Sequence, residues 1–152
     1  MNQIKMDLSN VVKVALQEVG YIESEGNKTK YGEWFGLNGV SWCGIFVSWC
    51  YAMGGVPLPK IGFKHGFAGC QTAVEYFSDK KMIAKNPVAG DIVFYDWQGD
   101  GRCDHTGIFF KRNDNETFLA IEGNTSTKNQ SNGGCVMVRN RHYKNCIFVH
   151  VS

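Results

Sequence analysis

The first half of the chain carries apolar residues at the spacing typical of helices. Between residues 8 and 19 they recur every three or four positions, which predicts an amphipathic helix that Gly20 helps to end. Residues 42–53 are apolar on nearly every side, so the helix predicted there belongs in the protein interior, with Ser41 as its N-cap. A further helix is predicted from about residue 68 to residue 77.

The segment between the first two predicted helices, residues 21–40, is rich in glycine and aromatic residues. This composition is typical of a loop, because glycine disfavours regular structure. The aromatic side chains either line a groove or pack the loop onto the protein, and the pattern leaves both interpretations open.

Beyond Pro87 the pattern changes to short runs of β-branched and aromatic residues separated by glycine and asparagine turns, which is typical of strands. The predicted strands are residues 91–96, 105–111, 117–122, 135–139 and 146–151. Helices that precede strands favour an α+β fold, with N-terminal helices packed on a mainly antiparallel C-terminal sheet. No repeat or linker interrupts the sequence, so we predict one domain that spans residues 1–152.

Composition and charge speak against a disordered chain and against a nucleic-acid binder. With 43% hydrophobic and 20% charged residues, the chain is expected to be globular and not disordered. The net charge of +2 is too small to indicate a nucleic-acid binder, and we interpret the one basic cluster as a solvated strand end. That cluster consists of Arg139, Arg141, His142 and Lys144.

The sequence also speaks against a membrane protein. No apolar run approaches the ~18 residues that a membrane-spanning helix needs, so we predict no membrane partner. The first residues, MNQIKMDLSNVVKV, are polar and amphipathic and do not resemble a signal peptide. We therefore expect synthesis in the cytoplasm.

Among the six cysteines, Cys43 is the candidate for chemistry. The cysteines form no CxxC pair and have no zinc-site spacing, so no structural metal is expected. Cys43 lies at the predicted start of the central helix, where unpaired N–H groups and the helix dipole favour a nucleophilic thiolate. A buried structural cysteine would occupy the same position, so the assignment needs a partner.

The partner candidate is His105, which opens a predicted strand after the glycine turn at residues 99–101. From such a position an imidazole can face a cleft and accept a proton from a thiol. Glu122 ends the next, apolar strand, where it would either hold the second nitrogen of His105 or remain an exposed charge.

Around these residues the sequence resembles the CHAP domain family, the cysteine- and histidine-dependent amidohydrolases and peptidases of phage endolysins and bacterial wall enzymes. The resemblance covers nearly the whole chain, and its motifs occur in order. They are NKTKYG at 27–32, VSWCGIFVSWC at 40–50, AGDIVFYDW at 89–97, DHTGIF at 104–109 and IEGNT at 121–125. The resemblance implies a papain-like α+β fold and peptidoglycan as the substrate.

The same resemblance implies roles for individual residues. It places Cys43 as the nucleophile, His105 as the base, Glu122 as the third member and Asn124 as a supporting polar residue. Family members cleave the amide between muramic acid and L-alanine, or a peptide bond in the stem or cross-bridge. We expect the first activity, an N-acetylmuramoyl-L-alanine amidase. A catalytically silent wall-binding module and a cysteine peptidase that acts on proteins are the alternatives from other classes.

Aromatic residues are the candidates for contacts with the sugar or the stem peptide. The candidate substrate-binding residues are Tyr31, Trp34, Phe35 and Trp97. Trp42 and Trp49 lie on the central helix and are predicted to belong to the core. We expect a monomer that acts on peptidoglycan of the bacterial cell wall.

Some family members bind calcium, and residues 96–101 resemble the first half of a calcium loop. The closing glutamate expected near Gly107 is missing, however. Residues 34–45, where the likeness would place other calcium ligands, contain no acidic residue. We therefore interpret residues 96–101 as a turn and predict no metal and no other cofactor.

Overall fold

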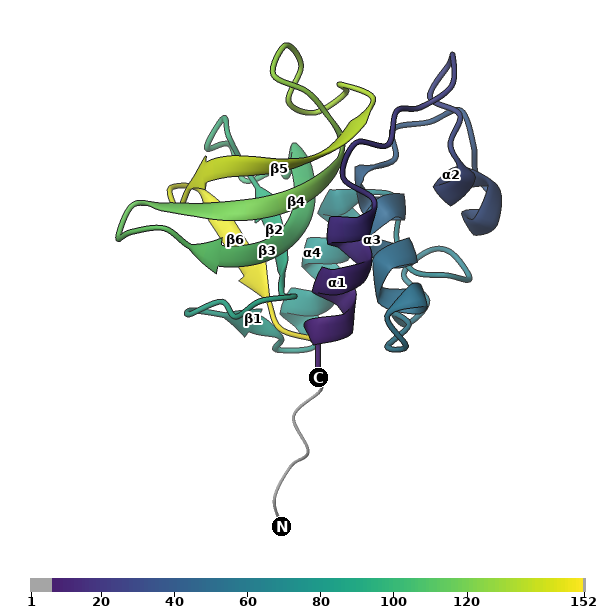
Figure 1. Cartoon of the computed structure of the whole chain (residues 1–152). Coiled ribbons are helices and arrows are strands. Elements are labelled where there is room, and N and C mark those ends of the chain that lie inside the picture. The colour runs from purple at the N-terminus through teal and green to yellow at the C-terminus, as the bar shows by residue number, and fades with distance from the viewer. Residues whose placement is uncertain (1–6, 152) are drawn as a thin grey trace.

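The computed structural model describes residues 7–151 of the chain. In this range helices come first and strands second, which confirms the predicted α+β class (Figure 1). The helices are α1 (Ser9–Gln17), α2 (Lys30–Phe35), α3 (Cys43–Met53) and α4 (Cys70–Asp79). The strands are β1 (Ile83–Ala84), β2 (Ile92–Tyr95), β3 (His105–Arg112), β4 (Thr117–Thr125), β5 (Cys135–His142) and β6 (Cys146–Val149).

The strands of the described chain form one sheet in the order β1-β6-β2-β3-β4-β5, and every neighbouring pair is antiparallel. Figure 1 shows the sheet on one side of the molecule and the helices on the other. Tyr95 at the end of β2 lies opposite His105 at the start of β3. The pairing of β4 with β5 shifts register between Glu122 and Thr125, and such an irregularity re-aims nearby side chains.

Helix α3 lies at the centre of the core, as its apolar sequence predicts, and most of its residues are buried. It packs against α1 and α2 on one side and against β3 and β4 on the other. An added Cβ at Gly123 of β4 would lie 2.7 Å from the Cβ of Phe46, so strand and helix approach more closely than a larger residue allows. This close approach brings the start of α3 beside the strands that carry His105 and Glu122.

Three local predictions were wrong. Helix α2 interrupts the predicted loop, and the Thr29 hydroxyl caps it by accepting a 2.9 Å hydrogen bond from the Gly32 N–H. Strand β1 was not predicted, because two residues carry no periodic pattern. Ser41 is not the N-cap of α3. Trp42 holds that position, while the Ser41 hydroxyl accepts a hydrogen bond from the Asn124 side chain instead.

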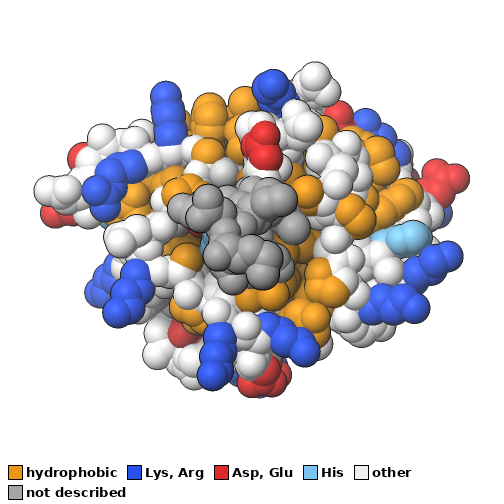
Figure 2. Space-filling view, turned by 90° about the horizontal axis from the view of Figure 1, so that it is seen from below, with side chains coloured by type: hydrophobic (Ala, Val, Ile, Leu, Met, Phe, Trp, Pro, Cys, Tyr) orange, Lys and Arg blue, Asp and Glu red, His pale blue; other side chains and the backbone are white. Residues whose placement is uncertain are grey.

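Within residues 7–151 no helix combines the length and the apolar character needed to cross a membrane. Figure 2 shows one face of the molecule, where lysine and arginine side chains are spread around the rim with hydrophobic side chains between them. The prediction about a signal peptide concerns the N-terminus, of which residues 1–6 lie outside the described residues.

Candidate active site

Cys43 is the first residue of α3, and its side chain is only 6% exposed. The first N–H groups of any helix have no partner within the helix, and they point toward this end. The thiol therefore lies where backbone dipoles favour negative charge. All six cysteines, Cys43 included, are free thiols in the described chain.

His105 is the first residue of β3 and is fully buried. Its Nε2 atom lies 2.9 Å from Oε1 of Glu122 on the neighbouring strand β4. Its Nδ1 atom has no hydrogen-bond partner among the described residues, which leaves this nitrogen for the nearby Cys43 sulfur. The structure thus brings together the three residues that the sequence singled out.

The surroundings of His105 favour its charged form. Burial alone would disfavour an imidazolium, but the Cys43 sulfur and then the Glu122 carboxylate outweigh it and raise the pKa of His105 to about 9. At neutral pH the ring is therefore protonated, with the ionised Glu122 carboxylate beside it.

Glu122 is fully buried within β4, so the structure supports the carboxylate that holds His105 and contradicts the exposed strand-end charge. It accepts a 2.6 Å hydrogen bond from the Tyr95 hydroxyl and two bonds from the Arg141 guanidinium. Burial raises the pKa of Glu122, but Arg141 and His105 overcome this effect and lower it to about 2. The carboxylate is ionised at every pH at which the site would work.

Arg141 was predicted to be a solvated charge at a strand end, and this prediction was wrong. Its side chain is 5% exposed, because β5 continues past residue 139 and carries the guanidinium to Glu122. The guanidinium also lies 5.2 Å from the ring centre of Tyr95 and 4.9 Å from that of Trp97. A buried Glu122 needs a cationic partner, but the sequence left the burial of Glu122 open and so did not point to Arg141.

Trp97 follows β2 and covers the outer side of this network. Its ring stacks on His105 with ring centres 5.6 Å apart and on Tyr95 at 5.1 Å. The side chain is half-buried. Among the predicted substrate-binding residues, Trp97 is thus the one that the structure places against the histidine.

Asn124 lies beside the site without a hydrogen bond to His105. Its backbone has a φ of 58°, in the left-handed region that asparagine tolerates. Its side-chain amide donates to the Ser41 hydroxyl at 3.2 Å and to Asn132 at 3.1 Å. Asn124 therefore anchors the segment that leads into Cys43.

Two of the predicted substrate-binding residues are buried, which corrects the expectation of exposed groove aromatics. Tyr31 is inaccessible to solvent because its ring stacks on Trp42, with ring centres 5.5 Å apart, between α2 and α3. Phe35 is 6% exposed and packs on Phe63. Trp34 is half-buried and stacks on His65 at 4.6 Å.

The segment 96–101 is closed by its own hydrogen bonds. The Asp96 carboxylate accepts the backbone N–H groups of Asp100 at 3.2 Å and of Gly101 at 2.8 Å, as in a turn. Across residues 7–151 no three His, Cys, Asp or Glu side chains gather in a group that could hold a metal ion.

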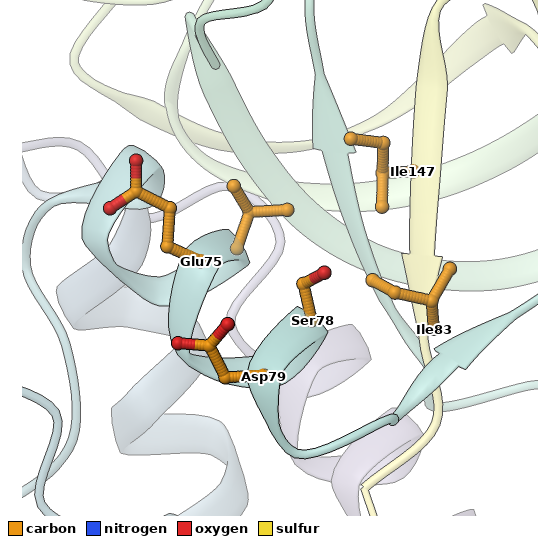
Figure 3. A pocket seen from close by; sticks show the side chains of 6 residues that line it. Glu75, Ser78, Asp79, Ile83 and Ile147 are labelled. Carbon is orange, nitrogen blue, oxygen red and sulfur yellow. The ribbon is translucent and has the colours of Figure 1, made fainter.

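A separate pocket of about 350 Å³ lies between α4, β1 and β6 (Figure 3). Its apolar wall is formed by Ile83 and Ile147, and Glu75 and Asp79 lie on the helix side (Figure 3). None of the predicted site residues lines this pocket.

Comparison with known proteins identifies the family. A family model described as CHAP domain matches residues 35–124, a range that includes Cys43, His105, Glu122 and Asn124. No curated protein and no solved structure matches the chain. The papain-like α+β fold of CHAP domains agrees with the helices and the antiparallel sheet described above. Because the match covers more than half of the chain, the protein belongs to the CHAP domain family, whose members are amidases and peptidases of cell-wall peptidoglycan.

Proposed function

We propose that this protein is a cysteine-dependent peptidoglycan amidase in which Cys43 is the nucleophile, His105 the proton carrier and Glu122 the residue that orients His105. One observation carries the proposal. The buried imidazole of His105 is held by Glu122 at Nε2 and leaves Nδ1 for the Cys43 sulfur. This is the arrangement that nucleophilic catalysis by cysteine needs.

The first half of the reaction forms an acyl-enzyme. The Cys43 thiolate attacks the carbonyl carbon of the amide, and the carbonyl oxygen becomes an oxyanion. Imidazolium at His105 then donates its proton to the amide nitrogen, the C–N bond breaks and the amine leaves. Because the pKa of His105 is raised to about 9, the ring already holds that proton at neutral pH.

The second half of the reaction releases the acid. Neutral His105 takes a proton from water, and the oxygen of that water attacks the thioester carbonyl. The C–S bond breaks, the carboxylic acid leaves, and the thiolate and imidazolium are restored. The backbone N–H of Cys43, at the start of α3, is the first donor to the oxyanion in both halves.

The scissile bond that we propose is the amide between the lactyl group of N-acetylmuramic acid and L-alanine. Trp97 beside His105 and half-buried Trp34 are the aromatic residues left to contact the substrate, since Tyr31 and Phe35 are buried. A tryptophan ring can pack against either a sugar face or a stem peptide.

The deciding experiment digests purified Gram-positive peptidoglycan with the wild type and with Cys43→Ala. Mass spectrometry then identifies the new ends. New L-alanine amino termini that appear only with the wild type establish the amidase, whereas new amino termini within the stem or cross-bridge establish an endopeptidase. If the digests by both proteins match the buffer control on several wall types, the protein is a wall-binding module without catalytic activity. If Cys43→Ala digests the wall, Cys43 is not the nucleophile.

A further inference from the structure

The carboxylate of Glu122 accepts more hydrogen bonds from Arg141 than from any other side chain. Arg141 donates from Nε to Oε2 at 2.8 Å and from Nη2 to Oε1 at 2.6 Å. Such a two-point contact fixes the plane of a carboxylate as well as its position. Oε1 is also the atom that faces Nε2 of His105, so the orientation of the imidazole follows from that of the guanidinium.

Arg141 is itself held in place. Its Nη1 atom donates to Gln130 in the loop between β4 and β5. Its planar head packs against the rings of Tyr95 and Trp97, at 5.2 and 4.9 Å from their centres. A guanidinium with every nitrogen bonded and rings along its face has little freedom to turn, so it provides a rigid support for Glu122.

Neither of the other partners of Glu122 can replace Arg141. The Tyr95 hydroxyl donates one bond to Oε2 at 2.6 Å and is neutral, and His105 makes one contact, with Oε1 at 2.9 Å, so neither fixes the plane of the carboxylate. The titratable and charged groups around Glu122 come from β2, β3, β5 and β6 and are Tyr95, His105, Arg139, Arg141 and Cys146. Of the two arginines, only Arg141 is within hydrogen-bonding distance of the carboxylate.

We propose that Arg141 is a positioning residue for the reaction, which acts by fixing the ionised Glu122 carboxylate and through it the ring of His105. This inference rests on the proposed function, since the roles of His105 and Glu122 belong to it. Arg141 lies outside the range that matches the family model, so the family assignment does not supply this role.

The test compares Arg141→Met and Arg141→Lys with a matched control, Arg139→Met. Arg139 lies two residues earlier on β5 and bonds to Thr125 and to the Ser126 carbonyl, not to Glu122. For each variant two profiles are measured from pH 4 to 9. One is kcat/KM on a soluble peptidoglycan fragment, and the other is the rate at which iodoacetamide alkylates Cys43, followed by mass spectrometry.

Arg141→Met is expected to lower kcat/KM roughly 10- to 100-fold, the loss typical when an outer hydrogen-bond partner that orients an active-site group is removed. Without the guanidinium, burial raises the pKa of Glu122 from about 2 into the measured range, so both profiles fall at their acid end, where those of the wild type do not fall through Glu122. Arg141→Lys keeps the charge but loses the two-point contact, and its profiles lie between those of the wild type and Arg141→Met. Both pH profiles of Arg139→Met are expected to coincide with those of the wild type.

The outcomes separate this inference from the proposed function. An equal loss of activity at every pH, with unchanged alkylation profiles, would reduce Arg141 to a structural role and overturn the inference. An equal shift in Arg139→Met would do the same. Should Arg141→Met not fold, the profiles of Arg141→Lys decide by the same criteria. If the wild type cleaves no peptidoglycan, the proposed function fails. The alkylation profiles of Cys43 still report whether Arg141 acts through Glu122 and His105.

Discussion

The two ring nitrogens of His105 have different neighbours, and this difference decides which of them exchanges protons. Nε2 lies 2.9 Å from the ionised Glu122 carboxylate and keeps its hydrogen whether the ring is neutral or charged. Nδ1 is buried without a hydrogen-bond partner among the described residues. Proton exchange is therefore confined to Nδ1, the nitrogen that serves the Cys43 sulfur and the leaving amine in the proposed reaction.

Glu122→Gln tests this assignment. The amide oxygen can still accept a bond, but the missing charge no longer supports imidazolium at His105, and Arg141 is left without its anion. We expect a residual rate roughly 10²- to 10⁴-fold below the wild type, as for the orienting carboxylate of other triads. Initial rates on a soluble peptidoglycan fragment measure it. Glu75→Gln on the exposed face of α4 is the control, and a wild-type rate for Glu122→Gln would exclude the role.

Calcium is expected to have no part in the reaction. The Asp96 carboxylate already accepts two backbone N–H groups, so the turn 96–101 holds its shape without a cation. Chelation by EDTA should therefore leave both the rate of wall lysis and the melting temperature unchanged. A loss of lysis in EDTA that added calcium restores would place a metal in the active protein.

Sequence reasoning singled out three residues that the fold brings together, but it misjudged burial elsewhere. Cys43, His105 and Glu122 stood out because their residue types and local settings suit nucleophilic catalysis. Whether Tyr31 is exposed and whether Arg141 is solvated depend on which elements cover them, and no local pattern carries that information. The ring of Tyr31 is covered by Trp42. The guanidinium of Arg141 is paired with the Glu122 carboxylate, which lies on a different strand.

The strands that carry the site are spaced by a glycine. An added Cβ at Gly107 of β3 would lie 2.6 Å from Cγ of Glu122, closer than atoms can approach. Gly107→Ala should displace the Glu122 side chain from His105 and lower kcat at least about tenfold, with about 1–3 kcal/mol lost in the free energy of unfolding. Denaturant titration and initial rates measure the two effects.

Gly69→Ala provides the matched glycine control. Gly69 precedes α4, and its added Cβ would meet only the Thr72 hydroxyl, at an ordinary 3.7 Å. Both rate and stability should stay close to those of the wild type in this variant. If Gly107→Ala behaves like Gly69→Ala, the β3–β4 spacing is not what holds Glu122 in place.

Long apolar elements were predicted well, and short or polar ones were not. Helix α3 begins one residue after its predicted start at residue 42, because a run of eleven mostly apolar residues is stable only as a buried element. Helix α2 has six residues, and its stability comes from the Thr29 cap and from packing on α3. Strands β4 and β5 run to Thr125 and His142, past their predicted ends, because the two strands pair with each other from Thr117 opposite His142 to Thr125 opposite Cys135.

The complete site exists only in the folded chain. It draws Cys43 from α3, Tyr95 from β2, His105 from β3, Glu122 from β4 and Arg141 from β5. The strand order places these four strands side by side, so one antiparallel segment of the sheet supplies every member of this group except Cys43. Two of its charged groups, His105 and Glu122, therefore link the stability of the whole protein to pH.

The two groups act at opposite ends of the pH scale. The pKa of Glu122 falls from an ordinary 4.5 to about 2, so its stabilising contribution is fully present above pH 4.5 and is lost as pH falls toward 2. The pKa of His105 rises from 6.5 to about 9, so its contribution is fully present below pH 6.5 and is lost as pH rises toward 9. Each limb changes the free energy of unfolding by on the order of 3 kcal/mol, because a shift of one pKa unit corresponds to ~1.4 kcal/mol.

The melting temperature of the wild type should accordingly be highest between about pH 4.5 and 6.5 and fall on both sides. Asp91 works against the acid limb, because burial raises its pKa, so the difference between wild type and variant is the informative quantity. Glu122→Gln should flatten the acid limb relative to the wild type, and His105→Gln the alkaline limb. Calorimetry from pH 3 to 9 measures these curves. Curves of both variants that run parallel to the wild type would show that the ion pair does not couple stability to pH, and that the carboxylate and imidazolium are not held as charges inside the fold.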